Sequence, residues 1–230
     1  MYGVDDGSKT LEESLIMLHR LEENGVTDVV LTPHYIENTR YSCNNIDKIK
    51  LYKEICSKAE EIGLNINIYL GNEVMVNNNL LEYLDTEILK INNSRYLLIE
   101  TDLKEKYPDF DIIISELLDN NIIPILAHPE RYLYVQKDYK CLNRYIEAGM
   151  LCQADCESLF NKYGKKANKT LIKLLKKNMI HFFGSDIHRK ETKINIKELE
   201  GKLKKIVKDD RKVEDLLKNN FDKVIRNKEI

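Results

Sequence analysis

The chain has 230 residues, 43% of them hydrophobic, so it can bury a sizeable core, and we expect one domain spanning residues 1–230. Its 36 basic and 38 acidic side chains nearly cancel, which argues against a nucleic-acid-binding surface. Five cysteines without a Cys-x-x-Cys pair predict reduced thiols, and the lack of a signal-like start or a long apolar segment predicts a cytoplasmic protein without direct membrane insertion.

The predicted elements alternate between helices and short apolar strands. The first helix starts at a capping box formed by Thr10 and Glu13 and stops at Gly25, and a second helix is expected at 45–62. Charged helices are expected at 194–207 and 213–219. Runs of strand length lie at 26–31, 66–70, 96–99, 122–127, 150–154 and 180–183. This alternation predicts an α/β protein with a parallel sheet built from right-handed βαβ units.

A potential metal ligand follows each of these six runs. The side chains are His34, Glu73, Glu100, His128, Asp155, and the pair Asp186 and His188. In a barrel the carboxyl ends of all strands meet at one rim, whereas an open sheet gathers only those near its switch point. We therefore predict a barrel that carries these side chains on its rim.

The chemistry of these side chains favours divalent metal ions. Imidazoles and carboxylates without thiolates suit Mn, Fe or Zn better than Mg or Ca alone, and such ions polarise a phosphoryl or carbonyl oxygen. One His or Glu after a strand is more often a cap or a solvated residue, but six in equivalent positions favour a site. A cysteine-based tyrosine phosphatase is excluded, because no cysteine is followed by five residues and an arginine.

An ordered set of motifs resembles the PHP-family bacterial protein-tyrosine phosphatases of capsule and exopolysaccharide clusters. The resemblance implies a distorted, TIM-like barrel of seven strands with up to three divalent ions, Mn first among them, at its carboxyl rim. The motifs are Val4-Asp5-Asp6-Gly7-Ser8, Thr32-Pro33-His34-Tyr35, Gly71-Asn72-Glu73, Ser94-Arg95-Tyr96-Leu97-Leu98-Ile99-Glu100, Ala127-His128-Pro129-Glu130-Arg131-Tyr132 and Gly184-Ser185-Asp186-Ile187-His188.

The same resemblance implies a set of metal ligands. One ion would be held by Asp6, His34 and His188, and a second by Glu73, Glu100 and His128, with Glu73 bridging toward a third ion served by Asp186. The family completes this third site with a His-x-His pair at the end of the first strand, and this chain begins after that pair. We therefore expect the first barrel strand to be missing, through a misassigned start or a fragment, with genuine loss as the alternative.

The resemblance also implies which residues act on the substrate. Arg131 matches a phosphate-binding arginine, Lys193 stands where the family has another, and His34 or His188 would protonate the leaving oxygen. The implied reaction is hydrolysis of phosphotyrosine on a partner protein, such as the tyrosine kinase that regulates polysaccharide synthesis. Two alternatives stay open: a phosphatase of a small phosphomonoester such as histidinol phosphate, and a regulatory protein that no longer catalyses.

Overall fold

A computed structural model describes residues 1–192 and 194–230 of the chain. Its described strands form a two-stranded sheet of β1 and β3 and a six-stranded sheet in the order β2-β4-β5-β6-β7-β8, and every pairing is parallel. The predicted parallel α/β architecture is therefore confirmed. The strands are β1 (Asp28–Leu31), β2 (His34–Tyr35), β3 (Asn67–Leu70), β4 (Glu73–Met75), β5 (Tyr96–Glu100), β6 (Ile123–Ala127), β7 (Leu151–Asp155) and β8 (Phe182–Gly184).

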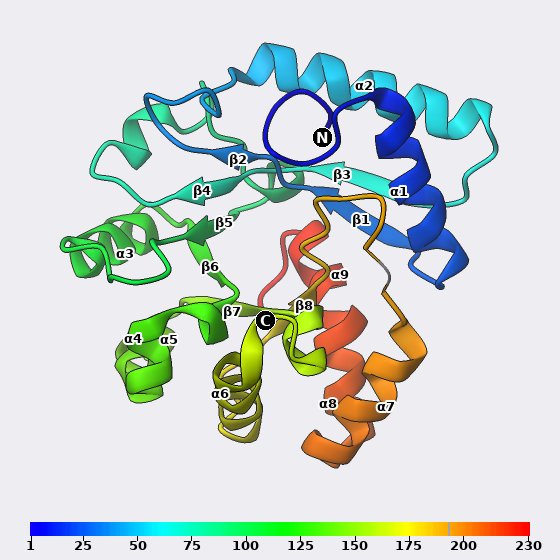
Figure 1. Cartoon of the computed structure of the whole chain (residues 1–230). Helices are drawn as coiled ribbons and strands as arrows, with labels where there is room; N and C mark the ends of the chain where they lie inside the picture. The colour runs from blue at the N-terminus through cyan, green and yellow to red at the C-terminus, as the bar shows by residue number, and fades with distance from the viewer. Residues whose placement is uncertain (193) are drawn as a thin grey trace.

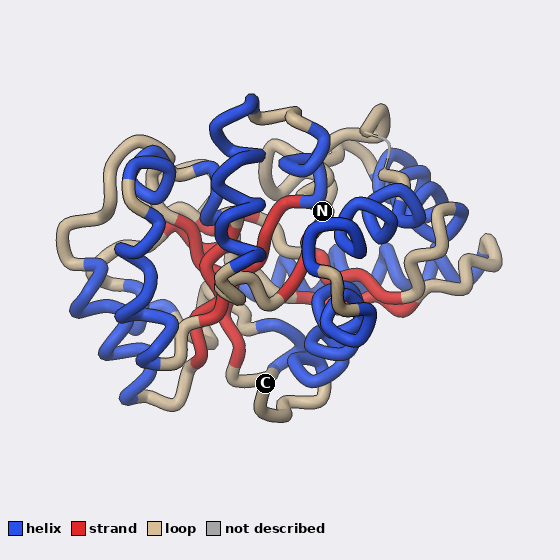
Figure 2. The backbone as a smooth tube through the Cα atoms, turned by 90° about the horizontal axis from the view of Figure 1, so that it is seen from below, coloured by secondary structure: helices blue, strands red, loops and turns tan. Residues whose placement is uncertain are grey.

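Most of the helices lie on the outside of the curved array of strands, whereas α9 lies between β1 and β8 (Figure 1), where Val224 packs with Leu98 and Phe182. The view from below in Figure 2 shows helices around the strands. The helices are α1 (Leu11–Glu23), α2 (Asn45–Glu61), α3 (Phe110–Asp119), α4 (Leu133–Lys137), α5 (Asn143–Ala148), α6 (Gly164–Lys176), α7 (Ile196–Val207), α8 (Asp210–Glu214) and α9 (Asn220–Ile225). The start of α1 agrees with the expected cap, since the Thr10 hydroxyl accepts a hydrogen bond from the Glu13 amide at 3.2 Å. The Glu13 carboxylate accepts from the Lys9 amide, so the second bond of a capping box is replaced by one to the preceding residue.

The described residues contain eight strands, two more than the sequence predicted. The additional strands β2 and β4 follow β1 and β3 after breaks of two residues, so His34 and Glu73 begin strands instead of following their ends. Pro33 has no amide hydrogen to donate to a ladder, and the Asn72 side-chain amide donates to the Pro33 carbonyl at 2.8 Å. Both breaks therefore lie side by side, and there the chain passes from the small sheet to the large one.

The two sheets face each other without a complete ring of hydrogen bonds. Within residues 1–192 and 194–230, the ladders leave one edge each of β1, β2, β3 and β8 unpaired. A cavity of about 440 Å³ reaches from the small sheet to β8 and has an apolar lining that includes Val30, Leu98, Ile125 and Phe182. In place of the expected seven-stranded barrel, the described strands form a curved parallel array that their hydrogen-bonded ladders do not close into a ring.

The large sheet is buried on both faces. All five residues of β5 are buried; Leu97 and Ile99 pack in the larger core with the helices, while Leu98 packs with Ile125 and Phe182 in a smaller inner cluster. Side chains of a strand alternate between its faces, and a parallel strand covered on both sides is apolar throughout. This double burial fixes the strand ends that carry the candidate site.

Two further expectations concern the cysteines and membrane insertion. All five cysteines are free thiols, as their spacing predicted. In the part of the chain that the structure describes, we find no helix with the length and apolar character needed to cross a membrane.

His181 provides a test of the fold's response to acid. Burial, together with the charge of Lys212, lowers the pKa of His181 from 6.5 to about 4, and its Nδ1 accepts a hydrogen bond from the Cys152 amide at 3.0 Å. Between these two pKa values the unfolded chain binds a proton that the folded chain does not, so the free energy of unfolding should fall as the pH drops from 6.5 to 4, by roughly 3 kcal/mol in total.

A His181→Asn variant should lose less stability over this pH range, because its amide oxygen can accept the Cys152 hydrogen bond without binding a proton. Urea denaturation at pH 7 and at pH 4.5 measures the difference. The same loss of stability in the variant and in the original chain would show that His181 does not control the acid response.

Candidate metal centre

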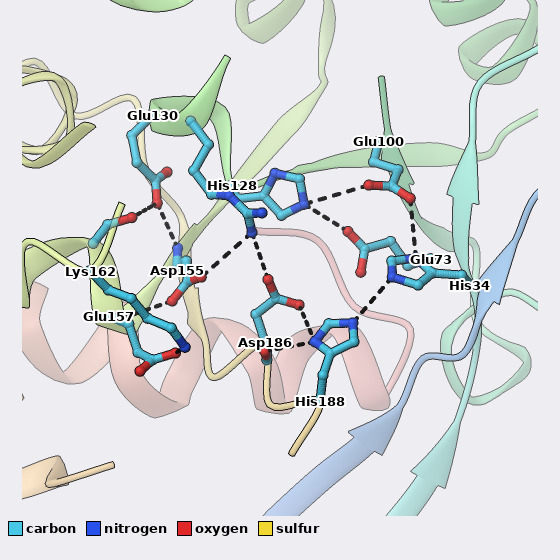
Figure 3. A network of polar contacts seen from close by, with 12 residues as sticks. His34, Glu73, Glu100, His128, Glu130, Asp155, Glu157, Lys162, Asp186 and His188 are labelled. Atoms are coloured by element: carbon cyan, nitrogen blue, oxygen red, sulfur yellow. Dashed lines mark hydrogen bonds and ion pairs between the residues drawn. The ribbon is translucent and has the colours of Figure 1, made fainter. Parts of the chain in front are cut away.

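The predicted metal ligands come together at the carboxyl-terminal side of the large sheet. Figure 3 shows imidazoles and carboxylates from separate strands and loops pointing toward one another. Glu100 and His128 lie at the carboxyl ends of the neighbouring parallel strands β5 and β6, while His34 and Glu73 pair with each other where β2 and β4 begin, just beyond the ends of β1 and β3. The structure gathers all seven predicted ligands here: Asp6, His34, Glu73, Glu100, His128, Asp186 and His188.

Asp6, His34 and His188 form the first group of ligand atoms. The Nε2 atoms of His34 and His188 are 3.1 Å apart, and each lies 3.7 Å from an Asp6 carboxylate oxygen. The Asp5 carboxylate accepts a hydrogen bond from the His34 amide at 3.0 Å, which ties the first loop to β2. Two imidazoles and a carboxylate at this spacing offer one cation three ligands.

The second group consists of Glu73, Glu100 and the two histidines beside them, and it is more deeply buried. His128 Nε2 is 3.0 Å from a Glu73 oxygen and 3.7 Å from a Glu100 oxygen. His34 Nδ1 is 3.1 Å from the other Glu100 oxygen, so the His34 ring lies between the two groups. Ligand atoms of His34, Glu73 and Glu100 lie within 4.8 Å of one another, close enough for a shared ion.

The pKa values of the histidines show how strongly this cluster attracts positive charge. Burial lowers the pKa of His34, but the hydrogen bond with Glu100 and the charges of Glu73, Glu100 and Asp5 outweigh it and raise this pKa to about 9. Burial also lowers the pKa of His128, yet its hydrogen bond with Glu73 brings the net pKa above the ordinary value. Protons thus balance the buried carboxylates, and divalent cations would satisfy the same set of donors.

Two of the predicted ligands have a strained backbone. His128 has φ 37° and Asp186 has φ 44°, the left-handed region that side chains with a Cβ adopt at a cost. Such strain concentrates at functional sites, where the surrounding structure enforces it. Here it lies directly after β6 and β8 and turns both side chains into the cluster.

Arg131 lies beside the metal cluster, on the short helix that follows β6. Its Nη1 atom donates to an Asp186 carboxylate oxygen at 2.7 Å and lies 3.7 Å from an Asp155 oxygen. The guanidinium also stacks over the Tyr163 ring, 4.2 Å from the ring centre. Arg131 is therefore held in one orientation, with its charge next to the candidate ligands.

The strand-end pattern placed Asp155 among the potential metal ligands, but the family resemblance assigned it to no ion, and neither gave Glu130 a role. Asp155 ends β7 as the strand pattern predicted, but its carboxylate lies next to Arg131 and outside both ligand groups. Glu130 is fully buried and accepts hydrogen bonds from the Ser158 hydroxyl at 2.6 Å and the Asp155 amide at 3.0 Å. Burial raises the pKa of Glu130, and burial with the charge of Asp186 raises the pKa of Asp155 to about 7.

The sequence predicted one phosphate-binding residue after β8, Lys193. Lys193 lies outside the described residues. Arg189 is exposed and lines the same cavity as Arg131 and His188, at the entrance to the candidate centre. The position of Arg189 at this entrance leaves it free to contact a bound anion.

A buried lysine supports the strand breaks from which His34 and Glu73 project. Lys48 is 1% exposed, and its ammonium group donates to the Asn72 side-chain oxygen at 2.7 Å and to the Glu87 carbonyl. Burial lowers the pKa of Lys48 to about 8. Because Asn72 also donates to Pro33, this network joins α2 to both breaks between the sheets.

Asn72→Ala is expected to lower the free energy of unfolding by about 3 kcal/mol, because it removes three hydrogen bonds of a buried side chain, to the Lys48 ammonium group, the Leu89 amide and the Pro33 carbonyl. Urea denaturation measures this loss. Asn78→Ala, at an exposed position six residues further along, is the control and should change stability by less than about 0.5 kcal/mol. Equal effects of the two substitutions would contradict the proposed role of the network.

Known proteins are similar to this chain in both sequence and fold. CapC of Staphylococcus aureus is 36% identical over 187 residues, covering 80% of this chain and 72% of the relative. The tyrosine-protein phosphatase CpsB of Streptococcus agalactiae is 29% identical over 194 residues, covering 82% of this chain and 79% of the relative.

A structural match agrees with these sequence relatives. It comes from the crystal structures of YwqE from Bacillus subtilis and CpsB from Streptococcus pneumoniae, described as metal-dependent tyrosine phosphatases, and has a TM-score of 0.92. It covers 99% of this chain and 92% of the solved chain at 22% identity, which shows a common fold. The family described as capsular polysaccharide synthesis, CpsB/CapC, matches residues 1–226. The chain therefore belongs to the CpsB/CapC family of capsular polysaccharide synthesis.

Proposed function

We propose that this chain is a metal-dependent protein-tyrosine phosphatase that acts on phosphotyrosine proteins. The main observation is the convergence of buried imidazoles and carboxylates next to the fixed guanidinium of Arg131. Family relatives such as CpsB of Streptococcus agalactiae are tyrosine-protein phosphatases, which supports the same activity. The absence of a Cys-x5-Arg motif from the sequence is consistent with chemistry that does not use a cysteine.

The ligand assignment belongs to this proposal. One divalent ion would be held by Asp6, His34 and His188, and a second by Glu73, Glu100 and His128; Asp186 would serve a third. The first choice of metal is Mn²⁺, with Fe or Zn compatible with the same donors. When bound, such ions polarise phosphoryl oxygens and lower the pKa of a nearby water.

The protein's own residues would bind the phosphate and supply a proton. The Arg131 guanidinium would bind a phosphoryl oxygen in the orientation fixed by Asp186, and it would balance the charge that develops on phosphorus-bound oxygens. The His188 side chain is 30% exposed and lines the cavity, whereas the His34 side chain is 15% exposed. His188 is therefore the better placed imidazole to protonate a leaving tyrosyl oxygen, in the state in which it is not bound to metal.

The partner and setting are also proposed. A family assigned to capsular polysaccharide synthesis suggests the tyrosine kinase that regulates this synthesis as the phosphotyrosine protein. Such a kinase would meet the phosphatase in the cytoplasm. We further propose that residues 1–230 act as a single domain, because the candidate ligands come from elements distributed from Asp6 to His188.

Activity on two substrates tests the proposal against the small-molecule alternative. The Mn²⁺-loaded protein should release phosphate from a phosphotyrosine peptide with a kcat/KM higher than its value for histidinol phosphate. The reverse order would favour a phosphatase of small phosphomonoesters. Stoichiometric binding of the phosphopeptide without phosphate release would instead identify a regulatory protein.

A further inference from the structure

A cavity of about 450 Å³ opens above the candidate metal centre, within the range of ligand-binding pockets. Its floor consists of predicted metal ligands and Arg131, and its walls come from the three loops after β2, the short helix η5 (Cys156–Phe160) and β8. The wall residues that are apolar or aromatic are Ile36, Tyr41 and Tyr163. The other wall residues are Lys162, Arg189 and Thr192, so the side formed by Ile36 and Tyr41, on the loop after β2, is the part of the wall without charge.

The two tyrosines stand next to the floor residues that would bind the phosphate and its metal ions. The Tyr41 and His34 ring centres are 6.4 Å apart, and the Arg131 guanidinium is 4.2 Å from the Tyr163 ring centre. Neighbouring groups hold both rings in place. The guanidinium of Arg40 lies 4.8 Å from the Tyr41 ring centre and donates to the Tyr41 hydroxyl at 2.6 Å.

We propose that Tyr41, together with Ile36, forms the subsite for the aromatic ring of the phosphotyrosine. This inference rests on the proposed function and specifies what selects the substrate. When the phosphate binds to the floor, the aryl ring of its ester group lies further out in the cavity, beside Ile36 and Tyr41. Aromatic rings attract each other at centre separations of about 4.5–7 Å, and the Tyr41 ring centre lies 6.4 Å from that of His34, next to the proposed phosphate position.

The geometry gives a reason for discrimination against phosphoserine and phosphothreonine. Their phosphate would reach the same floor residues, but their short side chains would leave the aromatic level of the cavity filled with water. Contacts that only the aryl group makes change the ratio of kcat/KM for phosphotyrosine to kcat/KM for phosphoserine, but they do not change the binding of the phosphate itself. Tyr163 contacts Arg131 directly, so a substitution there would also disturb the phosphate site. A substitution of Tyr41 should remove the contact with the aryl group without removing a contact of Arg131.

The first test compares Tyr41→Ala with Tyr41→Phe, which keeps the ring. With Mn²⁺ present, kcat/KM is measured for a phosphotyrosine peptide and for a phosphoserine peptide of the same sequence. Tyr41→Ala should lower the ratio of the two values by about tenfold, and Tyr41→Phe should keep it within about twofold. An unchanged ratio in Tyr41→Ala, with turnover and metal content retained, would overturn the inference.

Binding of phosphonates makes the inference independent of turnover. Benzylphosphonate carries the aryl group and methylphosphonate lacks it, and calorimetry measures both affinities on the Mn²⁺-loaded protein. Tyr41→Ala should lower the affinity for benzylphosphonate by about tenfold and leave the affinity for methylphosphonate unchanged. Equal weakening of both would contradict the subsite. If the original chain hydrolyses neither peptide, the proposed function fails, while these two affinities still decide whether an aryl subsite exists.

Discussion

Glu73→Gln is expected to lower kcat/KM for a phosphotyrosine peptide by about a thousandfold or more, together with a loss of bound metal. Glu73 is 4% exposed, contacts His128 at 3.0 Å and shares a ligand group with His34 and Glu100. Glutamine has nearly the same shape, so packing is preserved, but the carboxylate charge that would bind a cation is removed. Metal analysis after gel filtration and initial rates of phosphate release measure the two effects.

Glu157→Gln is the matched control for this substitution. Glu157 lies near the site and pairs with Lys162, but it belongs to neither ligand group. This variant should keep its metal content, and its kcat/KM should stay within about threefold of the original value. A Glu73→Gln variant that retains both metal and activity would refute the assignment of Glu73 as a ligand.

Arg131→Lys is expected to lower kcat/KM by about a hundredfold, mainly through a higher KM. Lysine keeps the charge but cannot donate to Asp186 and a phosphate oxygen from one planar group, and it does not stack on Tyr163 as the guanidinium does. Because Arg131 is not a predicted ligand, metal content should stay unchanged. A higher KM together with unchanged metal content would show that Arg131 binds the phosphate and not a metal ion.

Arg144→Lys is the control for Arg131→Lys. Arg144 also pairs with an aspartate and lies over a tyrosine ring, but it is exposed and lies outside the cavity above the metal centre. Its substitution should leave kcat and KM unchanged. Near-original kinetics in Arg131→Lys would show that this arginine only supports Asp186 and does not bind the substrate.

The sequence was sufficient to predict the architecture because local patterns encode it. Apolar runs between amphipathic helices indicated the parallel sheet, and Thr10 marked the start of α1. β2 and β4 could not be predicted, since they have two and three residues and no periodicity of their own. They exist because Pro33 and Asn72 break the preceding strands and the neighbouring chain then offers a new partner.

The site was predictable to the extent that it depends on strand ends. Histidines and acids in equivalent positions were expected to converge, and the structure brings them together from separate strands and loops. The support around Arg131 was not predictable, because Tyr163 reaches it only through the packing of α6 against the short helices at Pro129–Arg131 and Cys156–Phe160, and Asp155 only through the contact of β7 with the first of these. A sequence shows that Asp155 ends a strand, but not whether its carboxylate faces a metal site or a guanidinium.

Removal and restoration of metal tests the central claim most directly. The purified chain would be treated with a chelator, freed of it, and assayed for phosphate release from a phosphotyrosine peptide before and after addition of Mn²⁺. Our account predicts negligible release from the metal-free protein and recovery of turnover with Mn²⁺, in the original chain but not in Glu73→Gln. Equal rates with and without metal, or recovery in Glu73→Gln, would contradict it.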